Sequence, residues 1–395
     1  MRKMTAEERA KLSTPTKLAT SGRNADETFG FVNVPPYRGS TVLYKSMADL
    51  AARKNRYLYG THGSPSTDAL EEAWNVIEGS FGTVLLNSGL AACTTPLLAL
   101  LSAGDDILIP DSVYAPTRHF ADGILKRMGI GARYYDPMIG GGIEALMQPN
   151  TKVVFTESPG SLTFEVQDIP AIAAAARKHG AYTVMDNTWA TPLLFRPLDH
   201  GVDVSIQAGT KYPAGHSDVL IGWASCNERS YQLVKNAKLQ LGQHVSADDV
   251  FLTLRGLRTM DLRLREQGRN ALDIAHWLKA RPEVLKVLHP ALPDCPGHDL
   301  FKRDFKGASG VFSIVLNGAS REQAFAFADN LTLFGSGASW GGFESLIVFF
   351  DVTEMRKIAP FRPGGPTLRL QIGLEGVDDI KADLDQAFKA MKAFG

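Results

Sequence analysis

Residues 205–218 read SIQAGTKYPAGHSD, and this stretch indicates the fold class of the chain. An apolar run that we expect to be a strand ends at Thr210 and Lys211, a loop of glycine and polar residues follows, and residues 219–223 are expected to form the next strand. A lysine at the carboxyl end of a strand lies where open α/β sheets bind their ligands. A single lysine of this kind is more often an exposed turn residue, so a site requires a second group.

Asp186 is that second group. It ends another apolar run, residues 181–185, upstream of Lys211. An aspartate and a lysine on neighbouring strand ends are what pyridoxal phosphate requires, because the lysine amine binds the cofactor aldehyde and the carboxylate keeps the pyridine nitrogen protonated. Asp186 alone would more simply be a turn or capping residue. The pair in this order predicts a pyridoxal-phosphate site.

Strands and helices alternate through the first two-thirds of the chain. This alternation predicts an α/β fold with a mostly parallel mixed sheet flanked by helices. The expected strands cover residues 83–86, 106–110, 132–135 and 152–156 and the runs that end at Asp186 and Lys211, and the expected helices cover 66–78, 89 to about 104, 142–147 and 169–179.

A second, smaller unit is expected after residue 258. A chain of 395 residues is too long for one small core, so two domains are expected. A long charged helix over 260–280 would lead into a C-terminal α+β domain with strands at 311–316 and 367–372 and helices at 321–330 and 377–393. We therefore divide the chain into residues 1–64, a large domain over 65–258 and a C-terminal domain over 259–395.

The first 64 residues carry little hydrophobic periodicity apart from a short helix expected at 47–53. A long irregular stretch inside a compact domain is unusual. Residues 1–64 are therefore either a disordered tail or an arm that packs on another subunit.

The composition excludes several classes of function. Lys plus Arg and Asp plus Glu both number 42, so there is no excess of positive charge for binding nucleic acid or an acidic membrane. No apolar run is long enough to span a bilayer, and the charged first residues do not resemble a secretory signal. Cys93, Cys226 and Cys295 are far apart and form no metal-binding spacing. We expect a cytoplasmic protein with no metal, nucleic-acid or membrane partner.

Two further features lie at expected strand ends. The small-residue turn 88–92 opens a helix, so the backbone N–H groups of Gly89 and Leu90, together with the Thr210 hydroxyl, are candidates to bind the cofactor phosphate. Such turns are common, and the turn alone is weak evidence. Tyr114 follows the strand over 106–110 and is either a core ring or a flat surface for the cofactor ring.

Taken together, six segments resemble the Cys/Met-metabolism pyridoxal-phosphate enzymes. The resemblance covers nearly the whole chain and is least clear in the first 40 residues. Within the family the DNTWA segment resembles the β-lyase branch, of which bacterial cystathionine β-lyase is the nearest type. The six segments are SGLAA (88–92), DNTWA (186–190), QAGTKY (207–212), GHSD (215–218), SWGGFESL (339–346) and LRLQIGLE (368–375).

The resemblance implies a fold-type-I transferase subunit in a homotetramer of dimers, with each site completed by the N-terminal region of the neighbouring subunit. It implies a role for each matching position. Lys211 is the Schiff-base lysine, Asp186 the partner of the pyridine nitrogen, Tyr114 the stacking ring, Gly89, Leu90 and Thr210 the phosphate ligands, Arg369 the ligand of the substrate carboxylate, Ser339 and Trp340 the substrate side, and Tyr59, from the neighbouring subunit, a cofactor-binding and catalytic residue acting with Tyr114.

The implied activity is α,β-elimination from L-cystathionine, giving homocysteine, pyruvate and ammonia, with Lys211 as general base. A guanidinium such as that of Arg369 suits a carboxylate because it can bind both oxygens. The alternatives on the same cofactor are γ-lyase or γ-synthase chemistry, cysteine desulfhydration and racemisation. A non-catalytic binding protein on the same fold is the alternative from another class.

The sequence departs from the family pattern in one loop above all. Thr61 stands where the family usually has an arginine that binds the neighbour's phosphate, and His62 follows it. Ala208 stands where many relatives have serine, and Lys238 or Leu239 where β-lyases often have a tyrosine. These departures leave open the substrate and the source of positive charge at the phosphate.

Overall fold

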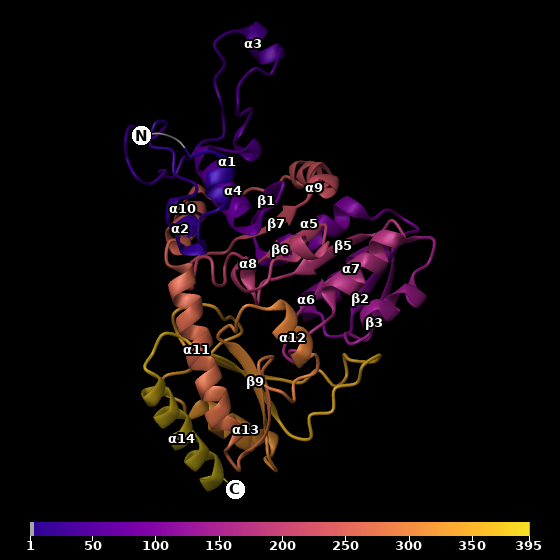
Figure 1. Cartoon of the computed structure of the whole chain (residues 1–395), viewed down its shortest axis with the longest axis vertical. Helices are drawn as coiled ribbons and strands as arrows, with labels where there is room; N and C mark the ends of the chain where they lie inside the picture. The colour runs from indigo at the N-terminus through magenta and orange to yellow at the C-terminus, as the bar shows by residue number, and fades with distance from the viewer. Residues whose placement is uncertain (1–3, 395) are drawn as a thin grey trace.

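Two β-sheets, joined by one long helix, organise the chain (Figure 1). The computed structural model describes residues 4–394, so Met1–Lys3, which belong to the expected arm, and Gly395 lie outside it. Within the described residues no helix is both long and apolar enough to cross a membrane.

The larger sheet has seven strands in the order β1-β7-β6-β5-β4-β2-β3. Strand β7 pairs antiparallel with β1 and β6, and the other neighbours pair in parallel. The predicted mostly parallel mixed sheet is therefore confirmed. The strands are β1 (Gly82–Leu86), β2 (Asp106–Pro110), β3 (Gly131–Tyr135), β4 (Thr151–Glu157), β5 (Tyr182–Asp186), β6 (Val204–Gln207) and β7 (Gly222–Cys226).

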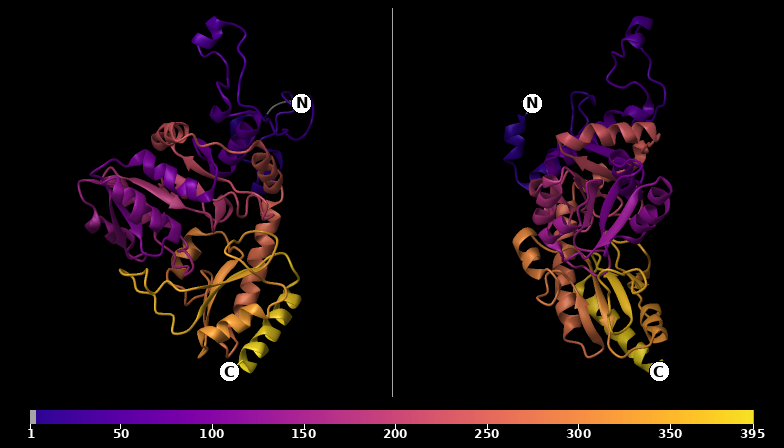
Figure 2. Two further views of the ribbon diagram at one scale, coloured as in Figure 1. Left: turned by 180° about the vertical axis from the view of Figure 1, so that it is seen from behind. Right: turned by 90° about the vertical axis from the view of Figure 1, so that its right-hand side faces the viewer.

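Helices cover both faces of this sheet (Figures 1 and 2), so all residues of β1, β2, β6 and β7 are buried. Sequence signals set the helix ends: in the first helix after the arm, Ser64 caps the N-terminus and Gly79 ends it in a left-handed conformation. The helices are α4 (Pro65–Glu78), α5 (Gly89–Leu100), α6 (Ala115–Phe120), η2 (Ala121–Leu125), η3 (Gly140–Leu146), α7 (Ile169–Lys178), α8 (Thr191–Leu194), η4 (Pro197–His200), α9 (Glu228–Gln240) and α10 (Ala247–Leu257).

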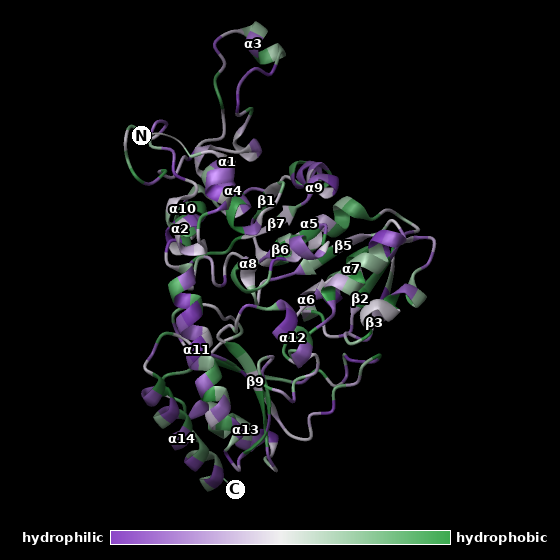
Figure 3. Cartoon of the chain, in the orientation of Figure 1, coloured by the Kyte–Doolittle hydropathy of each residue, from purple (hydrophilic) through white to green (hydrophobic). Residues whose placement is uncertain are grey.

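The smaller sheet has five strands in the order β10-β11-β12-β9-β8 and is entirely antiparallel except for the β10–β11 pair. Its helix α14 buries Ile380, Leu384, Ala387 and Phe388 at helical spacing, and polar residues cover the outer face (Figure 3). The elements are α11 (Met260–Lys279), β8 (Val284–Leu288), α12 (His298–Asp304), β9 (Val311–Leu316), α13 (Arg321–Asp329), β10 (Gly335–Ser336), β11 (Leu346–Phe350), β12 (Thr367–Gln371) and α14 (Val377–Ala393).

Two predicted strand ends are wrong. Strand β6 stops at Gln207 rather than Lys211, and β7 begins at Gly222 rather than at residue 219. The backbone leaves the sheet because Thr210 N donates to Ile221 O at 3.0 Å, which closes a loop between the strands. Gly209 allows this path, since an added Cβ would lie 2.1 Å from the Trp223 ring. Lys211 therefore lies in the turn after the strand.

The helix expected over 142–147 is a 3-10 helix, η3, because three consecutive glycines at its start disfavour an α-helix. The helix opened by the turn at 88–92 ends at Leu100 rather than near 104. The domain boundaries at 64/65 and 258/259 stay our proposal.

The arm, residues 4–64, contains α1 (Ala6–Ala10), α2 (Thr14–Thr20), α3 (Met47–Ala51) and η1 (Gly60–His62). Leu18 and Val34 are buried against the large-sheet side of the molecule, so part of the arm packs on its own chain. The segment that carries α3 projects away from the body (Figures 1 and 2). The arm is therefore only partly supported by its own subunit.

Candidate active site

The candidate site is a cavity of about 440 Å³ at the carboxyl ends of the parallel strands. Glu157 at the end of β4 pairs in register with Asp186 at the end of β5, and the turn after β6 brings Lys211 beside them. The C-terminal unit closes the cavity with Trp340 and Arg369. The cavity therefore lies where open α/β sheets bind ligands.

Asp186 is held in position by three donors. Its Oδ1 accepts from Thr188 N at 2.9 Å and from Thr188 Oγ1 at 2.5 Å, and Cys93 Sγ lies 3.6 Å from Oδ2 as a donor. Thr188 Oγ1 also accepts from Ala208 N at 3.0 Å, which links Asp186 to the turn that carries Lys211. Burial raises the pKa of Asp186, and the Thr188 hydrogen bonds oppose that rise. A positive group in the cavity would therefore be stabilised beside it.

Lys211 is a partly buried amine with a specific partner. Nζ donates to Ser339 Oγ at 2.9 Å and lies 5.3 Å from the centroid of the Trp340 ring. Burial, followed by the nearby Arg369 charge, lowers the pKa of Lys211 to about 8. The neutral amine is therefore available near neutral pH, as a nucleophile or a base requires.

The N-terminus of α5 faces the same cavity. Ser88 caps the helix through a bond from Ala91 N to its Oγ, while Gly89 N and Leu90 N have no acceptor within the helix. An added Cβ at Gly89 would lie 2.7 Å from Ala208 Cβ, so only glycine fits this close approach. The two N–H groups provide a site suited to a phosphate.

Thr210 lines the cavity, but its hydroxyl is already bonded. Oγ1 donates to Ile221 O at 3.1 Å and accepts from Ile221 N at 3.0 Å. The Thr210 hydroxyl must leave the Ile221 carbonyl before it can donate to a phosphate. Its role as a phosphate ligand stays a prediction.

Arg369 approaches the cavity from β12. Its Nη2 donates to Ser339 O at 2.9 Å, and Nε is buried with no hydrogen-bond partner in the described part of the chain. Burial lowers the pKa of Arg369 to about 10. A buried, unpaired guanidinium N–H favours an anionic ligand, so the geometry suits a substrate carboxylate.

Tyr114 lies at the start of α6 with its side chain about half exposed, and its backbone N donates to Glu157 Oε2 at 2.6 Å. The ring borders the cavity. Burial, then the charge of Asp186, raises the pKa of Glu157 well above its usual range. Burial therefore favours the neutral form of Glu157, which lines the cavity beside Asp186.

Three residues of the site were absent from our predictions: Cys93, Glu157 and Thr188. Cys93 and Thr188 contact Asp186 directly, and Glu157 pairs with it in register. The position of Glu157 at the end of the strand over 152–156 was a usable signal. Cys93, in the middle of a helix, carried no such signal in the sequence.

Tyr59 is not brought to this cavity within one chain. It is 48% exposed on the arm and is absent from the residues lining the Lys211 cavity. The backbone oxygen of the neighbouring Thr61 accepts a hydrogen bond from Lys238 Nζ at 3.4 Å. His62 lines a separate cavity of about 130 Å³ together with Lys238 and Glu71. The Tyr59–His62 loop therefore contributes to the Lys211 site only if a second subunit supplies it.

The described residues fit pyridoxal phosphate on three observations. The start of α5 offers open N–H groups for the phosphate, Asp186 is a partly buried carboxylate without a full counter-charge, and Lys211 is an amine with a lowered pKa. Within residues 4–394 no cluster of His, Cys, Asp and Glu could hold a metal ion. The donors suit an aromatic cofactor with a phosphate group.

Comparisons with known proteins point the same way. The sequence profile of the family described as "Cys/Met metabolism PLP-dependent enzyme" matches residues 15–389. A Rhizobium johnstonii protein, provisionally named a cystathionine beta-lyase, is 53% identical over 96% of each chain. The cystathionine beta-lyase MetC of Escherichia coli is 43% identical over 94% of this chain and 97% of its own length.

A solved structure has the same fold. The cystathionine gamma synthase of Xanthomonas oryzae, in complex with aminoacrylate and cysteine, is 32% identical and covers 97% of this chain and 99% of its own, with a TM-score of 0.89. The fold and the cofactor class are therefore shared across enzymes of different reaction type.

Proposed function

The chain belongs to the Cys/Met metabolism PLP-dependent enzymes, and on that premise we propose that it cleaves the Cβ–S bond of L-cystathionine. Its cofactor is pyridoxal 5'-phosphate. The reaction consumes one water and yields homocysteine, pyruvate and ammonia. The Lys211 amine, with its lowered pKa and its Ser339 partner beside Asp186 and Arg369, is the observation that carries the proposal.

Each residue of the site has a separate proposed role. When bound, the cofactor supplies a protonated ring that withdraws electron density from the substrate Cα. Asp186 holds the proton on the ring nitrogen, Gly89 and Leu90 bind the phosphate, and Tyr114 provides a flat surface for the ring. Thr188 and Cys93 keep Asp186 oriented toward the cavity.

Arg369 binds the substrate carboxylate and thereby fixes the direction of the Cα–H bond. The neutral Lys211 amine removes the Cα proton and later gives a proton to the departing sulfur. Ser339 keeps Nζ pointing into the cavity, and Trp340 stacks beside it. We propose these roles for Ser339 and Trp340 on the substrate side.

The test is a product assay on L-cystathionine with the purified holoenzyme. We expect pyruvate and free homocysteine. Release of 2-oxobutyrate would instead assign γ-elimination, the reaction type nearer to that of the Xanthomonas oryzae relative. A protein that stays colourless when pyridoxal phosphate is added would contradict every function that depends on this cofactor.

We also propose that the protein is cytoplasmic and forms a homotetramer built from two dimers. In each dimer the arm packs on the neighbouring subunit, and Tyr59 completes the neighbour's site. Support comes from the apolar side chains that the arm leaves in solvent. Phe29, Phe31, Leu43 and Met47 are 93%, 73%, 86% and 81% exposed. Several large apolar side chains exposed on one segment favour an interaction surface, and a second copy of this chain is the partner we propose.

A further inference from the structure

A long loop crosses from the smaller sheet to the larger one. Residues 351–366, here called the strap, connect β11 to β12 without any helix or strand, and run toward β2 and β3 (gold, lower right in Figure 1). Loops of this length without internal structure are uncommon in compact domains and usually have a function. The strap is anchored at two points on the larger unit.

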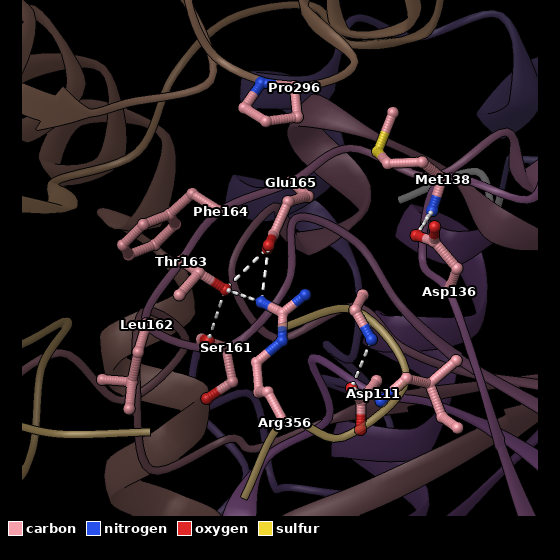
Figure 4. A network of polar contacts seen from close by, with 12 residues as sticks. Asp111, Asp136, Met138, Ser161, Leu162, Thr163, Phe164, Glu165, Pro296 and Arg356 are labelled. Carbon is pink, nitrogen blue, oxygen red and sulfur yellow. Dashed lines mark hydrogen bonds and ion pairs between the residues drawn. The ribbon is translucent and has the colours of Figure 1, made fainter. Parts of the chain in front are cut away.

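The first anchor is a buried ion pair. Arg356 Nη1 donates to Glu165 Oε1 at 2.5 Å and to Thr163 Oγ1 at 3.0 Å, and Thr163 Oγ1 donates to Glu165 Oε2 at 2.6 Å (Figure 4). The Arg356 and Glu165 side chains are 5% and 10% exposed. A pair this well buried and hydrogen-bonded leaves an uncompensated charge if one partner is removed.

The second anchor lies at the end of β2. Asp111 Oδ2 accepts from the backbone N–H groups of Ile358 and Ala359, each at 2.8 Å. Asp111 Oδ1 in turn pairs with Arg118 at 2.8 Å. The strap is therefore tied to the larger unit on both sides of Lys357.

Arg356 binds Thr163 and Glu165, and the residues next to these two form one wall of the active cavity. Pro159, Gly160, Ser161, Leu162 and Phe164 all line it. Leu162 and Phe164 have φ angles of 66° and 62°, a left-handed conformation that is unfavourable for such side chains. Strained residues persist only where the surroundings hold them.

The wall also has hydrogen bonds that do not involve the strap. Ser161 N donates to Ser112 O at 2.9 Å, Thr163 N donates to Ser161 O at 2.8 Å, and Cys295 Sγ donates to Phe164 O at 3.3 Å. Gly160 N donates to Glu165 O at 2.9 Å, Phe164 N donates to Gly160 O at 3.0 Å, and Ser313 Oγ donates to Leu162 O at 2.8 Å. The side chains of Thr163 and Glu165 are directed toward Arg356 instead (Figure 4). The strap thus adds a buried ion pair to the backbone and hydroxyl contacts that hold the strained segment.

We propose that Arg356 is a positioning residue: by binding Glu165 and Thr163 it holds wall residues 159–165 in the shape that receives the substrate. This inference rests on the proposed function, since the wall faces the same cavity as Lys211. Arg356 itself is absent from the cavity lining. Its loss is therefore expected to weaken substrate binding more than it slows the chemical step.

The experiment compares Arg356→Gln and Arg356→Lys with the control Lys357→Gln in the holoenzyme. Lys357 lies next in the strap, with an exposed side chain paired to Glu354 at 3.2 Å, so its loss is expected to matter little. We expect Arg356→Gln to raise KM for cystathionine about tenfold with kcat reduced less than about threefold. Arg356→Lys keeps the positive charge but lacks the planar guanidinium group. Its KM is expected to lie between those of the wild type and Arg356→Gln.

A second measurement does not depend on activity. Hydrogen exchange of the amides of Gly160 and Phe164 is expected to quicken at least about tenfold in Arg356→Gln, to a lesser degree in Arg356→Lys, and to stay unchanged in Lys357→Gln. Should Arg356→Gln fail to fold, Arg356→Lys provides the same comparison. The proposal would be overturned if exchange in the wall were unchanged in Arg356→Gln. It would also be overturned if kcat of that variant fell about tenfold while its KM stayed unchanged. Failure of the wild type to produce pyruvate would overturn the proposed function, while the exchange data would still test the wall.

Discussion

The carboxyl edge of the larger sheet and the arm differ in how far one chain satisfies their side chains. At the edge, Asp186 has donors from Thr188 and Cys93, and Lys211 has Ser339. On the arm, Phe29 and Leu43 are almost fully exposed. The groups around Lys211 have partners within one chain, whereas we propose that the arm packs on a second copy of the chain. Substitutions in one region are therefore expected to leave the other region intact.

The largest effect is expected from Lys211→Ala. The variant lacks the amine that we propose to bind the cofactor aldehyde and to move the Cα proton, so pyruvate formation is expected to fall at least about 10³-fold. The visible absorbance of the bound cofactor is expected to change at the same time. Steady-state assay and a spectrum of the purified variant test this, and full activity in the variant would contradict the role of Lys211.

Arg369→Lys is expected to have the next largest effect. A lysine keeps the positive charge but cannot donate two parallel hydrogen bonds to a carboxylate. The value of kcat/KM for cystathionine is therefore expected to fall about 100-fold, mainly through a higher KM. Arg265→Lys is the matched control, because that arginine lies on the exposed face of α11 in an ion pair with Asp261 at 3.0 Å. An equal loss in both variants would assign the effect to general destabilisation.

The comparison also shows what could be predicted from the sequence. Lys211, Asp186 and the turn at Gly89 were found because strand ends, helix starts and periodicity are local signals. Arg356 was missed because its partner Glu165 is 191 positions away, and neither residue has a local pattern. The end of β6 was misplaced for the same reason, since the Thr210–Ile221 contact that closes the loop forms only in the folded chain. Local chemistry can be predicted from residue patterns, but contacts that form only in the folded chain, such as Arg356–Glu165 and Thr210–Ile221, cannot.

The arm is tested by the double variant Phe29→Ser, Phe31→Ser. If the arm packs on a neighbour, removing two exposed rings is expected to reduce the molar mass in solution and to lower activity at low protein concentration, while the Lys211 cavity stays intact. Light scattering with a parallel assay measures both. Leu285→Ser, which removes an exposed side chain from β8 in the smaller sheet, is the control. An unchanged mass in the double variant would refute the proposed role of the arm.

The smallest expected effect is a pH dependence of cofactor uptake. The neutral Lys211 amine is the form that attacks the aldehyde, and burial lowers the pKa of Lys211 to about 8 from its usual 10.5. The rate at which the apoenzyme takes up pyridoxal phosphate is therefore expected to rise about tenfold between pH 7 and 9 and then to level off. Stopped-flow absorbance measures this rate, with Lys211→Ala as the blank. A rate that keeps rising to about pH 10.5 would mean that Lys211 titrates as an exposed lysine does, and that the cavity does not desolvate it.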